Sequence, residues 1–214
     1  MTWLARALML AVLFSFVLAI PQRAWAGAPT DQLRAEIDRA VKILEDPELK
    51  KDGRQRDRRA AVRQVANDIF DFSETAKRSL ARHWTPRTQA ENDEFVGLFT
   101  DLLERSYISK IELYGGEKIQ FVGETIEGEG AVVRTKLVTK QGTEIPIDYR
   151  MLKRGDNKWL VYDVVIEGVS LISNYRTQFN KIITTSSFQE LMKKMRTKQD
   201  EFIGEEKQKR TSQP

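Results

Sequence analysis

The chain has 214 residues, of which 35 are Lys or Arg and 31 are Asp or Glu, giving a net charge of +4. A nucleic-acid-binding protein normally carries a stronger or more clustered positive charge, so the composition argues against that class. The sequence contains no cysteine and a single histidine, His83, which excludes disulfides and leaves too few ligands for an ordinary zinc site.

The N-terminus has the features of a secretory signal peptide. Arg6 precedes a run of apolar residues from Ala7 to Ile20, and Ala24-Trp25-Ala26 is a small-x-small cleavage motif. The run is about 14 residues long, shorter than the roughly 20 that a membrane-spanning helix needs. We therefore predict a signal peptide over residues 1–26, cleaved after Ala26, and export to the periplasm. An uncleaved membrane anchor is the alternative.

Helices are expected in the first half of the remaining chain. Apolar residues at helical spacing predict a helix over residues 30–45. After a charged loop over residues 50–59, a second helix is expected from the apolar stripe Val62, Val65, Ile69 and Phe72. Asp71 and Glu74 have the spacing of a capping box, which predicts a new helix running to about Ala81. Thr85-Pro86 predicts the start of a longer helix, with Thr85 as its N-cap.

Four strand-like segments follow, over residues 118–127, 131–140, 143–154 and 158–166. The short, glycine-containing separators between them are typical of hairpin turns and predict an antiparallel meander. The last strand is almost entirely apolar, so both of its faces are expected to be covered.

The chain ends in two further predicted helices, from Ser170 to about Ile183 and from Ser187, where Glu190 completes a second capping box. A polar tail is expected over residues 204–214. This order predicts an α+β fold, with a curved antiparallel sheet of four to five strands packed against several helices in one domain over residues 27–203.

The sequence contains no recognisable catalytic set. His83 lies at a helix junction and is interpreted as a turn residue. The arginine-rich segment 54–63 is interpreted as an exposed helix start, with a contact to acidic headgroups or a partner as the alternative. Asp163 is an unusual charge in an apolar strand. It is interpreted as ion-paired with Arg150 or Arg176, and a headgroup or catalytic contact is the alternative.

Four blocks of sequence are distinctive. They are the segment Trp159 to Phe179; Phe70-Asp71-Phe72-Ser73-Glu74, followed by Ala81 to Pro86 and then Phe95, Phe99, Leu102 and Leu103; Ile147 to Leu152, leading to Trp159; and Glu167-Gly168-Val169-Ser170 with Tyr175, Arg176 and Phe179. Their order resembles the MlaC (toluene-tolerance) family of periplasmic phospholipid-binding proteins, which are auxiliary components of an ABC transporter. The resemblance covers roughly Thr30 to Phe202, and Ala81 departs from it where the family often has glycine.

This resemblance implies a soluble carrier that moves phospholipid between an outer-membrane lipoprotein–porin complex and an inner-membrane ABC transporter complex, in support of outer-membrane lipid asymmetry. It also implies that acyl chains insert in a cavity between the sheet and the helices. The phospholipid is then cargo, with no cofactor, metal, nucleic acid or catalysis involved. A monomer is expected, because nothing in the sequence indicates a self-association surface.

Transfer of two acyl chains of about sixteen carbons out of water is worth up to about 25 kcal/mol, so such a carrier needs a dry, apolar cavity. Apolar and aromatic residues of the predicted sheet and helices are the candidate lipid-binding residues, with ordinary core packing as the alternative for each. The candidate lipid-binding residues are Phe70, Phe72, Trp84, Phe95, Leu98, Phe99, Leu102, Leu103, Ile147, Tyr149, Val161, Tyr162 and Val165.

The alternative function is that of a periplasmic enzyme, or of a chaperone or adaptor, with an apolar pocket.

Overall fold

The computed structural model describes residues 28–155 and 157–211, and its side chains except those of residue 109 and residues 205–211. The signal peptide predicted for residues 1–26 lies outside these ranges. Within the described part of the chain, no helix is both long enough and apolar enough to cross a membrane.

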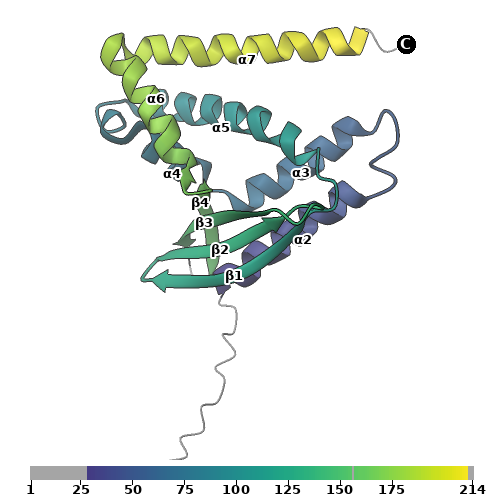
Figure 1. Ribbon diagram of the computed structural model, residues 1–214. Helices are drawn as coiled ribbons and strands as arrows, with labels where there is room; N and C mark the ends of the chain where they lie inside the picture. The colour runs from purple at the N-terminus through teal and green to yellow at the C-terminus, as the bar shows by residue number, and fades with distance from the viewer. Residues whose placement is uncertain (1–27, 156, 212–214) are drawn as a thin grey trace, which may run out of the picture.

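The described residues form an α+β fold, which confirms the predicted class. The five strands form one antiparallel sheet in the order β1-β2-β3-β4-β5. In Figure 1, α7, α5 and the sheet follow one another from top to bottom, and α2 crosses the sheet. The elements are α2 (Ala28–Glu45), α3 (Gln55–Ile69), α4 (Phe72–Leu80), the short 3-10 helix η1 (Ala81–His83), α5 (Gln89–Ile111), β1 (Lys118–Glu127), β2 (Gly130–Val138), β3 (Glu144–Arg154), β4 (Lys158–Ile166), β5 (Val169–Ser170), α6 (Leu171–Thr185) and α7 (Phe188–Thr211).

Two of the predicted helix starts are confirmed by their caps, and one is wrong. The backbone N–H of Glu74 donates to Asp71 Oδ1 over 2.8 Å, and that of Glu190 donates to Ser187 Oγ over 3.1 Å. Helix α5 begins at Gln89 rather than at Thr85-Pro86. Thr88 caps it, because Thr88 and Glu91 form a reciprocal capping box that satisfies two free backbone donors.

The last helix is longer than the sequence pattern indicated. Helix α7 continues through Gly204 to Thr211, where a polar tail was expected. Its N-terminal half carries the apolar residues that pack on α5 and α6. A helix that is anchored at one end can propagate into a polar segment, because each added residue forms a further backbone hydrogen bond.

A β-bulge in β4 changes which of its side chains share a face. Met151 pairs with Val161 whereas Arg150 pairs with Asp163, so Tyr162 is the extra residue. Beyond the bulge, Val164 lies opposite Tyr149, and Val165 lies opposite Asp148. Directly opposed residues point to the same face of a sheet.

Val165 therefore does not share a face with Tyr149 and Val161, which corrects the expectation that all three line one wall. Strict alternation places Val161 and Val165 together, but a single extra residue reverses the alternation after it. Val164 takes the position beside Tyr149 that Val165 was expected to have.

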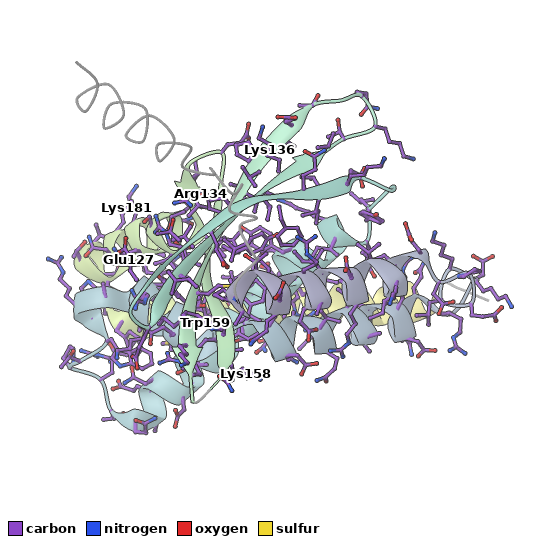
Figure 2. All side chains as sticks on the ribbon, turned by 90° about the horizontal axis from the view of Figure 1, so that it is seen from below. Glu127, Arg134, Lys136, Lys158, Trp159 and Lys181 are labelled. Carbon is purple, nitrogen blue, oxygen red and sulfur yellow. The ribbon has the colours of Figure 1, made fainter. Side chains whose placement is uncertain are left out.

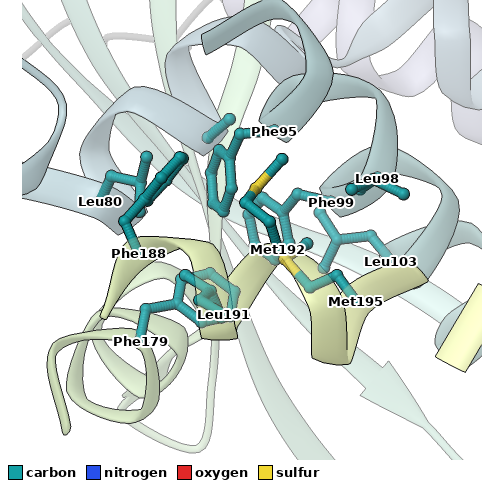
Figure 3. Packing of buried hydrophobic residues seen from close by; sticks show 11 residues of the cluster. Leu80, Phe95, Leu98, Phe99, Leu103, Phe179, Phe188, Leu191, Met192 and Met195 are labelled. Atoms are coloured by element: carbon teal, nitrogen blue, oxygen red, sulfur yellow. The ribbon is translucent and has the colours of Figure 1, made fainter. Parts of the chain in front are cut away.

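The buried apolar residues form two clusters rather than one. The helical cluster, shown in Figure 3, joins α4, α5, α6 and α7, and consists of Ala76, Leu80, Phe95, Leu98, Phe99, Leu103, Phe179, Phe188, Leu191, Met192 and Met195. The sheet cluster joins α2, the end of α3 and the strands, and consists of Leu33, Ile69, Ala131, Val133, Met151, Trp159 and Val161.

Ala81 has a strained backbone at the end of α4, with φ 50° and ψ −120°. An L-residue is disfavoured there because its Cβ approaches the backbone carbonyl, and a glycine is not. We expect Ala81→Gly to raise the free energy of unfolding by about 1 kcal/mol, which corresponds to about 2–4 °C in Tm.

Thermal unfolding followed by circular dichroism measures this effect. Ala60→Gly, at an exposed position inside α3, is the control and is expected to lower stability by about 1 kcal/mol. Equal destabilisation by both substitutions would contradict the strain at Ala81.

Candidate functional site

One face of the sheet is mainly apolar, apart from Glu124 and Thr135, and is only partly covered. The cross-strand partners Ala131 and Met151, and Val133 further along, are buried in the sheet cluster beneath α2 and α3. The apolar side chains that continue this face toward the other end of the strands stay partly exposed. They are Leu137, Ile145, Ile147, Tyr149 and Val164. The sheet thus presents an apolar surface next to the helices that none of them fully covers.

Two stacked rings connect the two clusters. Phe70 packs on the sheet cluster and Phe72 on the helical cluster, and their ring centroids are 5.6 Å apart. Between them, the Asp71 N–H donates to the Val161 carbonyl over 2.8 Å, which ties the α3–α4 junction to β4. The junction therefore holds the helical cluster against the edge of the sheet at one fixed point.

Three partly buried tyrosines belong to these clusters. Tyr107 and Tyr175 pack on the helical cluster, and burial is the main cause that raises the pKa of each. Tyr149 packs on the sheet cluster, and burial raises the pKa of its hydroxyl to about 12. Tyr149 nevertheless keeps part of its surface accessible. Burial disfavours the charged phenolate, which accounts for the direction of this shift.

Six of the predicted lipid-binding residues are buried, including Val165 on the opposite face of the sheet. Phe95, Leu98, Phe99 and Leu103 are buried in the helical cluster. The Phe95 ring lies edge-on to Phe179 with centroids 5.5 Å apart. Val161 is completely buried in the sheet cluster. These residues form well-packed core, which was the alternative for each of them.

The remaining predicted lipid-binding residues, from the sheet and from the helices, are only partly buried. Phe70, Phe72, Trp84, Leu102, Ile147 and Tyr149 all keep accessible surface. Tyr162 is also partly buried, but its ring lies against the Arg78 guanidinium, 4.2 Å from the ring centroid to Cζ, and so faces α4. Sequence reasoning missed Val164, whose position depends on the bulge, and Tyr107 and Tyr175, which helical spacing from Phe99 and Phe179 would have indicated.

Asp163 has a structural role. It is only 2% exposed, and Arg150 Nη1 donates to its Oδ2 over 3.1 Å, which confirms the first of the two predicted arginine partners. The Ser170 hydroxyl and the Ile172 N–H also donate to this carboxylate, over 2.7 and 3.1 Å. Arg176, the other predicted partner, donates instead to the carbonyl of Arg78. The carboxylate therefore fixes the first turn of α6 to β4.

The arginines of segment 54–63 are largely engaged in ion pairs. Arg54 pairs with Asp57 within the segment. Arg59 and Arg63 pair with Glu112 and Glu104 of α5, over 2.9 and 2.8 Å. These two contacts join α3 to α5, so at least part of the basic segment serves the fold.

A small pocket lies at the start of β4, where Figure 2 labels Lys158 and Trp159. Its volume is about 130 Å³, which is below the range of about 300–1,000 Å³ typical of ligand sites. This recess is therefore too small for a phospholipid. Its lining residues are Gln32, Ala35, Glu36, Asp68, Ile69, Lys158 and Trp159.

No group of three or more His, Asp or Glu residues within the described ranges is arranged to hold a metal ion. His83 lies in η1, where its Nε2 is 3.0 Å from Asn180 Oδ1. Arg82 donates to the same amide oxygen over 2.8 Å. This is the turn position expected for the histidine.

Comparison with known proteins gives a consistent result. A family model described as "MlaC protein" matches residues 34–197. The intermembrane phospholipid transport system binding protein MlaC of Haemophilus influenzae is 22% identical over 138 residues, which is 61% of this chain and 64% of that protein. The aligned region thus spans less than two thirds of that relative's length.

A solved structure has a similar fold. It is a phospholipid-binding protein from Ralstonia solanacearum in complex with a phospholipid, with a TM-score of 0.70, 24% sequence identity, and coverage of 80% of this chain and 96% of that chain. At this level of identity the likeness establishes the fold.

Proposed function

The chain belongs to the MlaC family, and we propose that it is a periplasmic phospholipid carrier that moves lipid between an outer-membrane lipoprotein–porin complex and an inner-membrane ABC transporter complex. The observation that carries this proposal is the partly covered apolar face of the sheet beside the helical cluster. The relatives support it, because their names describe phospholipid binding and intermembrane phospholipid transport.

In this proposal the acyl chains lie at the boundary of the two clusters. Ile147, Tyr149 and Val164 form the wall on the side of the sheet, and Phe70, Phe72 and Leu102 form the wall on the side of the helices. Apolar side chains that keep accessible surface can exchange contact with water for contact with a lipid. Each methylene group removed from water contributes about 0.8 kcal/mol, so a modest apolar surface is sufficient to hold a chain.

The buried residues of the helical cluster support this wall and do not contact the lipid. Phe95 and Phe99 are already surrounded by aromatic rings of α6 and α7. Displacing them would forfeit close-packed contacts that the lipid would have to replace. Trp84 packs on the outside of the same cluster and is assigned the same supporting role.

The alternative of a periplasmic enzyme depended mainly on Asp163. That carboxylate is paired with Arg150, accepts two further hydrogen bonds and is only 2% exposed, so these contacts account for it without a substrate. A chaperone or adaptor would use the same apolar surface for a peptide. The identity of the bound molecule separates these functions.

We expect protein purified without detergent to retain one phospholipid molecule per chain. Native mass spectrometry gives the stoichiometry, and organic extraction followed by lipid analysis gives the class. Delipidated protein incubated with phospholipid vesicles and re-isolated is the matched control, and it should regain the same mass increment. A chain that is empty after purification and takes up no lipid from vesicles would contradict the proposal, and a co-purified peptide would favour the adaptor.

A further inference from the structure

We propose that the hydroxyl of Tyr149 donates a hydrogen bond to an ester carbonyl of the bound lipid, and that the site thereby prefers ester-linked glycerolipids to ether-linked ones. This inference rests on the proposed carrier function and extends it to the chemistry of the cargo.

The position of Tyr149 is the first observation. It lies in the middle of β3, between Val133 on β2 and Val164 on β4. All three point to the same, mainly apolar face of the sheet. Val133 is fully buried there, whereas Tyr149 and Val164 are partly exposed. Its polar atom is thus carried into surroundings that are otherwise apolar.

The second observation is that the Tyr149 hydroxyl has no hydrogen-bond partner among the side chains and backbone of residues 28–155 and 157–204. The hydroxyl oxygen also keeps some accessible surface, so a ligand atom or a water molecule can reach it. By contrast, Tyr107 and Tyr175 on the helical side are polar neighbours of each other, and each affects the pKa of the other. A hydroxyl without a hydrogen-bond partner in apolar surroundings is unfavourable unless a ligand or a water molecule forms a hydrogen bond with it.

The chemistry of a phospholipid matches this donor. Below the phosphate, the polar atoms of the molecule are the ester oxygens, and these only accept hydrogen bonds. The raised pKa of Tyr149 keeps its proton in place at physiological pH, so the hydroxyl is available as a donor. An ether-linked lipid has the same chains and headgroup but lacks the carbonyl, and it offers the hydroxyl only an ether oxygen, which is a weaker acceptor placed closer to the glycerol.

The test is a competition between two lipids that differ only in the linkage. Delipidated protein is incubated with vesicles containing equal amounts of diacyl and dialkyl phosphatidylethanolamine with matched chain lengths. Native mass spectrometry then gives the ratio of the two bound species. For the wild type we expect a preference of about fivefold to tenfold for the ester-linked lipid, the value of one net hydrogen bond.

Tyr149→Phe is expected to retain total occupancy and to reduce this ratio to about one, because the ring is kept and only the donor is removed. Tyr162→Phe is the matched control, since that ring packs on Arg78 and faces α4. It should leave the ratio unchanged.

The outcomes separate the two proposals. Equal binding of both lipids by the wild type, or an undiminished preference in Tyr149→Phe, overturns the role of Tyr149 and leaves the carrier function intact. Failure of the wild type to take up either lipid overturns the carrier function itself.

Discussion

Replacing Val164 with aspartate is expected to lower phospholipid occupancy more than tenfold, while the fold is retained. Val164 lies beside Tyr149 on the partly covered apolar face of the sheet. A carboxylate placed there must lose its hydration when acyl chains enter, at a cost of several kcal/mol, and each 1.4 kcal/mol lowers the affinity tenfold. Lipid uptake from vesicles, measured by native mass spectrometry, gives the occupancy.

Val132→Asp is the matched control for this experiment. Val132 is also a partly buried valine in the sheet, but it pairs with Arg150 and points to the opposite, charged face. It should leave lipid uptake close to that of the wild type. Equal loss of lipid in both variants would mean that the effect comes from weakening the sheet, and unchanged uptake in Val164→Asp would remove Val164 from the wall.

A second pair of variants covers the case in which Val164→Asp does not fold. Val164→Trp introduces no polar group and reduces the space available to acyl chains, so it should also lower occupancy relative to Val132→Trp. Charges at Leu103 or Val161 are poor tests, because these residues are 5% and 0% exposed. A charge there would destabilise a packed cluster whether or not lipid binds.

Removal of the Asp163 carboxylate is expected to give the largest loss of stability. In Asp163→Ala the Ser170 hydroxyl and the Ile172 N–H lose their buried acceptor, and Arg150 loses its partner. Hydrogen bonds to a charged group contribute about 1.5–3 kcal/mol. Because Arg150 is partly exposed and can be rehydrated, we expect a total loss of about 3 kcal/mol. This is about 6–12 °C in Tm, measured by thermal unfolding.

Asp148→Ala is the control for the loss of a carboxylate from the same sheet. Asp148 lies on the neighbouring strand, opposite Val165, and is expected to change stability by less than about 0.5 kcal/mol. A wild-type Tm for Asp163→Ala would show that the carboxylate is not needed to attach α6, and would make a functional role for Asp163 worth testing again.

The strands were the most predictable part of the fold. Turn-forming separators such as Gln141-Gly142 and the alternation of Ile145, Ile147 and Tyr149 fix hairpins locally, and the observed strands follow them closely. The capping pairs Asp71 with Glu74 and Ser187 with Glu190 marked helix starts for the same reason. Each of these signals acts over a few residues, so no knowledge of the tertiary structure is needed.

The candidate site was less predictable, because membership of a wall depends on contacts between distant segments. Helical spacing identified Phe95 and Phe99 as apolar positions, but only the packing of α6 and α7 shows that they are enclosed. The bulge at Tyr162 exchanged Val164 for Val165 on the relevant face. It arises from pairing between two strands and leaves no local signal.

The sequence by itself determined the order of helices and strands, the family resemblance and the absence of disulfides. Only the tertiary structure decided that the buried residues divide into two clusters, and which side chains remain partly exposed between them. The physical reason is that an apolar side chain has the same sequence signature whether it fills a core or lines a surface that a ligand can cover. The difference depends on how completely the other elements occupy the space beside it.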